Sequence, residues 1–232
     1  MGVRNEVRQG ALKHMLMLLV QRMMGVGFFY LAAGTMRDMR GNVNLALYLA
    51  ASVVACAMMW GGHQETLHAR GKKQENTKHW DKILLPILVA LTYYGMYAAA
   101  GLGVRYGWGR LNLAWFAVGT AVYGVSCVFT VWPVLENKHF EAAARIQGDR
   151  SQMVVSTGPY RIVRHPGYLG IVLWAIASAL MFGTLAAGIV AAAIVIVLLV
   201  RTALEDSILK KELDGYAAYA EKVKYRLFPF IW

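Results

Sequence analysis

Charged side chains are scarce in this sequence, and their scarcity decides its class. Only 16% of the residues are Asp, Glu, Lys or Arg, whereas 58% are hydrophobic and the mean hydropathy is +0.43. Soluble domains carry about a quarter charged residues. The composition therefore excludes an ordinary soluble domain and predicts an integral membrane protein.

Cysteine is almost absent as well. Cys56 and Cys127 both fall inside apolar stretches, which argues against a disulfide scaffold or a metal site built on cysteine. His63, His68 and His79 lie in one wet, basic loop and do not form a convincing set of ligands, so we expect no metal. No secretory signal with a small-residue cleavage site precedes the first apolar run, so we expect that run to be retained.

Long apolar runs are what the sequence has in abundance. A helix needs roughly 20 mostly apolar residues to cross a bilayer, and helices satisfy the backbone amides that lipid cannot. We therefore predict an all-α integral membrane protein with about five to six transmembrane helices. The second and fifth runs are short, which predicts tilt or partial insertion. The predicted spans are 14–35, 44–60, 83–103, 112–134, 167–182 and 184–203.

Basic residues are distributed unevenly between the loops. With Arg201 counted at the end of the last span, 19 Lys and Arg residues fall on one set of alternating loops and 4 on the other. The positive-inside rule then places both termini in the cytoplasm. The same asymmetry accounts for the net charge of +11 without nucleic acid as a partner. Arg22 lies inside the first run and is expected to face protein or to snorkel toward the interface.

Three polar segments connect or follow the spans. The loop 61–82 is predicted to be a solvated connector. Residues 136–147 favour a surface helix that ends at Gly148, residues 153–155 an extended piece, and Ser156 to Pro159 a turn. After Arg201, apolar residues from Leu204 to Leu227 recur at helical spacing and predict a basic amphipathic C-terminal helix.

The segment 157–168 concentrates polar chemistry at the start of the fifth span. Pro166 is typical of a first helical turn, which leaves backbone N–H groups free to attract an anion. Cationic and aromatic side chains suited to carboxylate or purine contact surround that start. They are Tyr160, Arg161, Arg164, His165 and Tyr168.

A helical hairpin predicts the partner of this segment. The fifth span rises about 24 Å, turns near Gly183, and the sixth span returns Arg201 and Glu205 to the level of His165. Arg201 and Glu205 are four residues apart and share a helix face. The residues alone leave an alternative open, in which the arginines anchor the membrane, the tyrosines form an aromatic belt, and Arg201 pairs with Glu205.

The order of these motifs resembles the isoprenylcysteine carboxyl methyltransferase family and the related membrane phospholipid methyltransferases. The resemblance is carried by Gly158-Pro-Tyr-x-x-Val-Arg-His-Pro-Gly-Tyr168, an apolar hairpin, Arg201-x-x-x-Glu-Asp206, Leu213-x-x-Tyr-x-x-Tyr219 and the terminal Arg-Leu-Phe-Pro-x-Ile-Trp232. It covers residues 137–232. It implies methyl transfer from S-adenosylmethionine, leaving S-adenosylhomocysteine, to a lipophilic or membrane-delivered acceptor.

The resemblance also implies roles for particular residues. Arg201 would face the acceptor, and Glu205 would contact the cofactor and serve catalysis. The residues implied to bind the cofactor are Gln147, Gln152, Met153, Val154, Val155, Tyr160, His165, Pro166, Gly167, Tyr168 and Glu205. This sequence departs from the family pattern at Asp206, where a second glutamate is common, and in a short spacing between Gln147 and Val155.

Two regions and several functions follow. Residues 1–134 are predicted to be N-terminal transmembrane helices on the acceptor side, and residues 135–232 the catalytic methyltransferase region. Carboxyl methylation of an isoprenylcysteine-like acceptor competes with N-methylation of a phospholipid headgroup or methylation of another small lipophile. A non-catalytic transporter or sensor is the alternative of another class. The expected partners are the bilayer and the acceptor, and the expected location is a prokaryotic cytoplasmic membrane with the active site on the cytoplasmic side.

Overall fold

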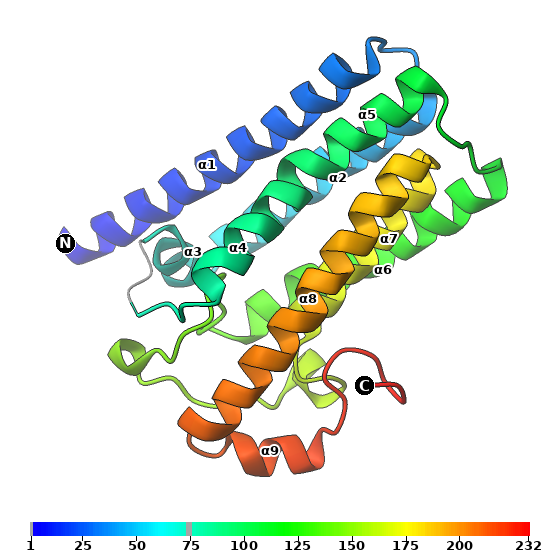
Figure 1. The fold of residues 1–232 in the computed structure, drawn as a ribbon. Coiled ribbons are helices and arrows are strands. Elements are labelled where there is room, and N and C mark those ends of the chain that lie inside the picture. The colour runs from blue at the N-terminus through cyan, green and yellow to red at the C-terminus, as the bar shows by residue number, and fades with distance from the viewer. Residues whose placement is uncertain (1, 73–75) are drawn as a thin grey trace.

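A computed structural model describes residues 2–72 and 76–232, and within them the chain is helical with no β-strand (Figure 1). A π-helical turn, η1 (Leu91–Gly95), joins α4 to α5 in one continuous rod, and short 3-10 turns η2 (Gly148–Arg150) and η3 (Gly158–Arg161) precede α7. The α-helices are α1 (Gly2–Ala33), α2 (Met39–Trp60), α3 (Gln64–Gly71), α4 (Asp81–Ala90), α5 (Met96–Tyr106), α6 (Leu113–Glu136), α7 (Pro166–Phe182), α8 (Leu185–Glu212) and α9 (Tyr216–Lys222).

The predicted membrane architecture is confirmed. Five helical rods are long and apolar enough to cross a bilayer, namely α1, α2, the rod from α4 to α5, α6 and α8. The sixth predicted span is α7, which is apolar but only 17 residues long. Helix α1 begins well before residue 14, and α8 continues past residue 203 to Glu212. Both therefore extend beyond the length that hydrocarbon requires.

The two ends of the bundle differ in content (Figure 1). One end holds only the tight connections α1–α2, α5–α6 and α7–α8. The other end holds α3, the connector 137–165, the last turns of α8, and α9. Most of the polar chain is thus gathered at one end, which is where any water-dependent chemistry must occur.

The hairpin of α7 and α8 forms as the sequence predicts. Gly183 ends α7 in the left-handed region (φ 65°), which glycine adopts without strain. The Thr184 hydroxyl then accepts a hydrogen bond from the Ala187 amide (3.3 Å) and caps α8. Helices α6 and α7 can pack closely because Gly170 has no side chain. A Cβ at this position would lie only 2.7 Å from the Phe129 backbone. Small residues allow such backbone approach between membrane helices.

Arg22 faces protein inside the bundle. Its guanidinium carbon lies 4.3 Å from the Tyr48 ring centroid and 4.8 Å from that of Tyr93, which η1 presents. The ring faces give the cation an electrostatic partner at membrane depth. Of the two placements predicted for Arg22, the structure shows the side chain facing protein and not snorkelling toward the interface.

Two predictions for the polar segments were wrong. The loop 61–82 contains α3, whose Thr66 and Leu67 are buried against α1 and its neighbours. Residues 137–147 are not helical. Tertiary partners take the backbone groups that a helix would use: the Ala142 carbonyl accepts from Arg201 and the Ala144 amide donates to Asp81. Residues 152–156 run as irregular chain.

The C-terminal amphipathic helix is present in two pieces. Helix α8 ends at Glu212, and Gly215 adopts φ 79° before α9 begins. The side chain of Lys78, which lies between α3 and α4, pairs with Glu212 at this corner (2.8 Å). Beyond α9, residues 223–232 form a hook that returns along α7 and α8 (Figure 1). The apolar residues from Leu204 to Leu227 do lie mostly in helices, as predicted. Gly215, whose backbone is in the left-handed region, bends the chain in the middle of this segment.

Candidate active site

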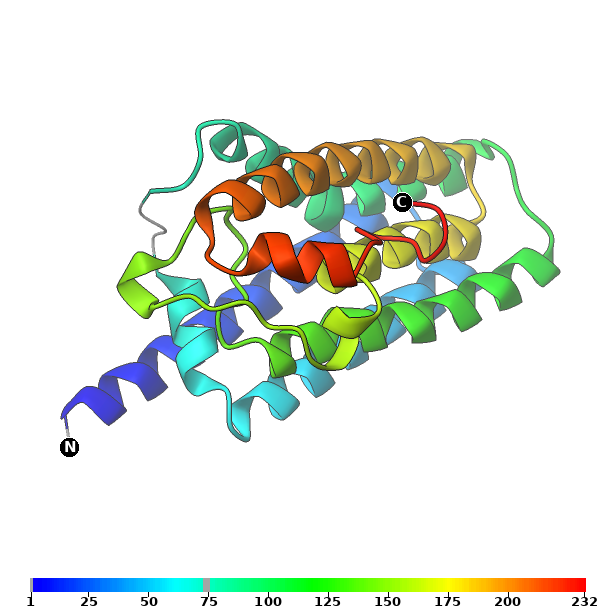
Figure 2. The same cartoon turned by 90° about the horizontal axis from the view of Figure 1, so that it is seen from below.

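A pocket at the polar end contains every residue that the sequence implied for cofactor binding, from Gln147 to Glu205. The connector supplies one wall, the start of α7 the floor, and α8 with α9 the opposite wall. Figure 2 shows α9 lying beside this connector across the end of the hairpin. Folding therefore brings these residues together, while their contact with a cofactor stays a prediction.

Tyr168 and Glu205 connect the two halves of the pocket. The Tyr168 hydroxyl donates to a Glu205 carboxylate oxygen at 2.5 Å, a short distance typical of a bond to an ionised acceptor. His165 packs nearly parallel to the Tyr168 ring, with centroids 5.8 Å apart. The hairpin places Glu205 at the level of His165, as predicted. The predicted alternative of an Arg201–Glu205 pair does not occur among the described ion pairs.

Arg201 lies behind Tyr168 and outside the pocket lining. Its Nε donates to Asp81 Oδ1 at 2.7 Å, and a terminal nitrogen donates to the Ala142 carbonyl at 2.9 Å. Its guanidinium carbon lies 5.2 Å from the Tyr168 ring centroid. Arg201 and Asp81 are 1% and 0% exposed. The role implied for Arg201 toward the acceptor stays a prediction, because the structure gives it a buried carboxylate instead.

Asp206 follows Glu205 in α8 and holds several side chains next to the pocket. It accepts from Arg164 Nε (2.7 Å), Arg164 Nη2 (3.0 Å) and the Tyr216 hydroxyl (3.0 Å). His165 Nε2 lies 3.5 Å from Asp206 and 3.4 Å from the Tyr216 hydroxyl. Arg164 also donates to the Val223 and Lys224 carbonyls. The Arg164 cation predicted for a ligand is thus committed to Asp206 and the tail.

The connector wall is built by Gln147 and Gln152. The Gln147 side chain donates to the His139 carbonyl at 2.6 Å, and the Gln147 amide donates to the Gln152 side chain at 2.8 Å. His139 lines the pocket at 4% exposure, and both of its ring nitrogens are buried without a hydrogen-bond partner. Burial, with Arg150 and Lys138 nearby, holds the pKa of His139 below its ordinary value. Its neutral ring is left with polar atoms that a ligand would satisfy.

The predicted anion site at the start of α7 is largely occupied by the helix itself. The amides of Tyr168 and Leu169 both donate to the His165 carbonyl (3.1 Å each), and Pro166 has no N–H. Gly167 is needed for packing, because a Cβ there would lie 2.6 Å from the Phe140 ring. We therefore correct the prediction: of the first turn, only the Gly167 amide remains for a ligand.

Tyr160 joins η3 to α6 and α9. Its hydroxyl accepts from Asn137 (3.2 Å), and its carbonyl accepts from the Tyr219 hydroxyl (2.7 Å). Burial raises the pKa of Tyr160 well above its ordinary value, and burial likewise raises that of Tyr219. Both phenols therefore remain neutral donors at physiological pH. Arg161, by contrast, is exposed and does not line the pocket.

Sequence reasoning missed several residues of the site. His139 and Asn137 fell in a segment predicted to be helical, so nothing directed their side chains to the pocket. Asp81 precedes a membrane span and carries no signal that would pair it with Arg201, 120 residues later. Tyr216 and Tyr219 have helical spacing, but the bend at Gly215 is what turns them toward the connector, where they line the pocket with Leu209 of α8.

Membrane-length helices with a polar pocket at one end define the class of protein, an integral membrane protein. Residues 120–211 match the model of the isoprenylcysteine carboxyl methyltransferase (ICMT) family. This region, which contains the connector, α7 and most of α8, is therefore similar to that family, and the match supports a membrane methyltransferase. A comparison with curated proteins returns no match.

Proposed function

We propose that the protein transfers a methyl group from S-adenosylmethionine to the carboxylate of a lipophilic, isoprenylcysteine-like acceptor. The observation that supports this most directly is the Tyr168–Glu205 hydrogen bond, which joins α7 to α8 and holds a carboxylate in the pocket beside Tyr168 and His165. The family supports a methyltransferase. The donor, the acceptor and the cytoplasmic position of the site belong to the proposal.

The residues present fit the proposed donor. When bound, S-adenosylmethionine supplies a methyl group on a positively charged sulfur. The Glu205 carboxylate, which lines the pocket, offers negative potential for that charge. The two unpartnered nitrogens of His139 offer hydrogen bonds to the polar parts of the molecule. The apolar side chains of residues 153–155 complete the wall on the connector side.

The protein's contribution to the reaction would be positional. A methyl displacement needs its three reacting atoms in line and shielded from water. Tyr168 and Glu205 fix one helix of the hairpin against the other at the pocket. Arg201, held by Asp81, supports the Tyr168 ring from behind and acts as a positioning residue. A carboxylate acceptor needs no general base, whereas an amine acceptor would require Glu205 to take a proton.

Binding of S-adenosylhomocysteine, followed by calorimetry on protein in detergent, tests the donor. We expect binding by the unmodified protein and loss of binding in Glu205→Gln. Glu221→Gln is the matched control, because it makes the same chemical change at an exposed position of α9. Folded protein that binds no S-adenosylhomocysteine would overturn the proposal.

Radiolabelled S-adenosylmethionine identifies the acceptor class. The protein is incubated with a membrane lipid extract or with a prenylcysteine analogue, and the product is treated with base. Carboxyl methyl esters release labelled methanol on base treatment, whereas N-methyl groups keep the label. Label retained in a phospholipid amine would replace the proposed carboxyl chemistry with the headgroup alternative.

A further inference from the structure

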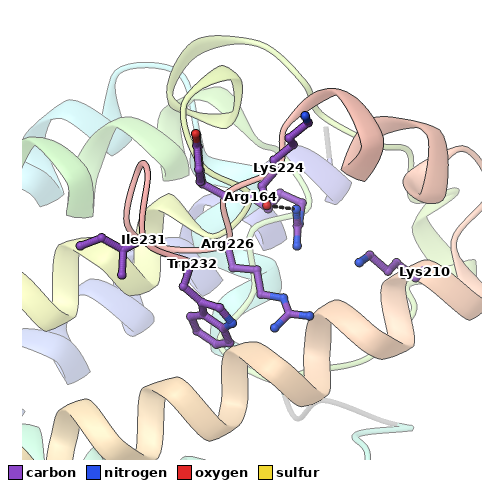
Figure 3. Close-up of a pocket in the computed structure, with 7 residues that line it drawn as sticks. Arg164, Lys210, Lys224, Arg226, Ile231 and Trp232 are labelled. Carbon is purple, nitrogen blue, oxygen red and sulfur yellow. Dashed lines mark hydrogen bonds between the residues drawn. The ribbon is translucent and has the colours of Figure 1, made fainter.

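A second groove lies on the outer side of the site, between the tail hook and α8. Its volume is about 440 Å³. Figure 3 shows the Arg226 and Trp232 side chains next to each other beside α8, with Lys210 projecting from α8 on the side of Arg226. The hook supplies most of the lining, which consists of Arg164, Lys210, Lys224, Tyr225, Arg226, Ile231 and Trp232. Apart from Arg164, none of these residues lines the pocket described above.

The groove carries an excess of positive charge. Four of its lining residues are cations, and the described ion pairs join three of them, Arg164, Lys210 and Arg226, to the single carboxylate of Asp206. Arg164 engages Asp206 with two nitrogens, whereas Lys210 and Arg226 lie farther from it, at 3.3 and 3.1 Å. Lys224 is exposed. One buried carboxylate is therefore shared by three cations while Lys224 adds a fourth positive charge, and an anion in the groove would be attracted.

The same hook exposes apolar side chains next to these cations. Phe230 and Ile231 are 87% and 81% exposed, and Phe230 holds φ 67°, a costly conformation for a residue with a side chain. On the other side of the hook, Leu227 is fully buried with Leu169. The Arg226 guanidinium carbon lies 4.9 Å from the Trp232 ring centroid. Apolar tips beside lysines and tryptophan are typical of the headgroup zone of a bilayer.

We infer that this groove binds the phosphate of an anionic phospholipid from the surrounding membrane. Lys210, Lys224 and Arg226 receive the headgroup, and the acyl chains extend past Phe230 and Ile231. Charge alone would fit a free phosphate ion equally well. The exposed apolar pair at the rim is what favours a lipid, because an aqueous anion gains nothing from it.

Native mass spectrometry of the detergent-solubilised protein tests the inference with defined lipids. We expect one phosphatidylglycerol to bind at least tenfold more tightly than phosphatidylcholine, since each basic residue near an anionic headgroup contributes about fivefold. The double variant Lys210→Gln/Lys224→Gln should lose most of that preference. Lys211→Gln/Lys222→Gln is the matched control, because it removes the same charge from exposed lysines of α8 and α9 outside the groove.

Two further arms separate a lipid from a free anion. Phe230→Ser/Ile231→Ser should weaken phosphatidylglycerol binding severalfold, and inorganic phosphate at millimolar concentration should not displace the lipid. Thermal unfolding of each variant establishes that it is folded. Equal binding of the two lipids, equal losses in the two lysine pairs, or displacement by inorganic phosphate would each overturn the inference. None of these measurements depends on methyl transfer, so they are independent of the proposed function.

Discussion

Arg201 and Asp81 form an ion pair that is almost completely removed from solvent, with 2.7 Å between Arg201 Nε and Asp81 Oδ1. The pair joins the first turn of α4 to α8, and both partners also bind the connector, at Ala142 and Ala144. Three separate parts of the chain are thereby fixed immediately behind Tyr168. The N-terminal half of the molecule thus contributes directly to the architecture of the site.

Breaking this pair is expected to destabilise the protein strongly. Asp81→Ala leaves a buried guanidinium without a counter-charge, which costs about 3–5 kcal/mol. The unfolding temperature in detergent measures the loss. Glu212→Ala, which breaks the exposed Lys78–Glu212 pair, is the control and should cost less than about 1 kcal/mol. Similar losses of stability in the two variants would show that the buried Arg201–Asp81 pair contributes no more to stability than the exposed Lys78–Glu212 pair.

The Tyr168 hydroxyl is expected to matter for ligand binding more than for folding. Tyr168→Phe keeps the ring that packs on His165 and Arg201 but leaves Glu205 without its donor. A hydrogen bond to a charged group contributes about 1.5–3 kcal/mol, so the dissociation constant for S-adenosylhomocysteine should rise at least tenfold. Calorimetry measures it, and Tyr106→Phe, at an exposed position far from the pocket, is the control. Unchanged affinity would separate the Tyr168–Glu205 bond from cofactor binding.

Stability is expected to fall as the pH falls, because of His139. Burial lowers the pKa of this imidazole in the folded protein, so the unfolded state binds the proton more readily. The contribution of the neutral His139 ring to the free energy of unfolding is complete above the ordinary histidine pKa of about 6.5. It is lost progressively as the pH drops below that value. Unfolding temperatures between about pH 8 and pH 5 measure the effect. The decrease in unfolding temperature should be smaller in His139→Gln than in the unmodified protein. It should be unchanged in the control His79→Gln, because the His79 side chain is exposed. Equal decreases in the two variants would contradict the role of His139.

Asp206 is expected to control the tail. Asp206→Asn removes the charge that holds Arg164 and Arg226, so hydrogen exchange in residues 223–232 should become faster. The control is Asp214→Asn, an exposed aspartate between α8 and α9. Exchange measured by mass spectrometry distinguishes the two. Equal protection of the tail in both variants would mean that apolar packing of Leu227 is sufficient to hold it.

Helix packing at Gly170 is expected to tolerate no side chain. Gly170→Ala would put a methyl group 2.7 Å from the backbone of α6, so the two helices must separate, at a cost of about 1–3 kcal/mol. Gly188→Ala is the matched control, since a Cβ at this position of α8 meets nothing within 4 Å. Thermal unfolding compares the two variants. A Gly170→Ala protein as stable as the control would show that the α6–α7 interface accommodates a methyl group without loss of packing.

The membrane helices, and the approach of Glu205 to His165, could be predicted from the sequence because both depend on local signals. Apolar length defines the spans, and the hairpin geometry alone brings Glu205 to His165. The connector could not be predicted, since its alanines and charges favour a helix while Arg201 and Asp81 take its backbone groups. For the same reason His139, Asp81 and the partners of Arg164 were missed: each depends on a contact distant in sequence.

The backbone bonds of the tail have a consequence for biosynthesis. The amides of Arg164 and His165 donate to the carbonyls of Tyr225 and Arg226, about sixty residues later in the chain. At about 5–20 residues per second, translation reaches the second partner roughly 3–12 s after the first. All the membrane helices have been synthesised before these bonds can form. The order of synthesis therefore delays completion of the site until the helical bundle that supports it has already been made.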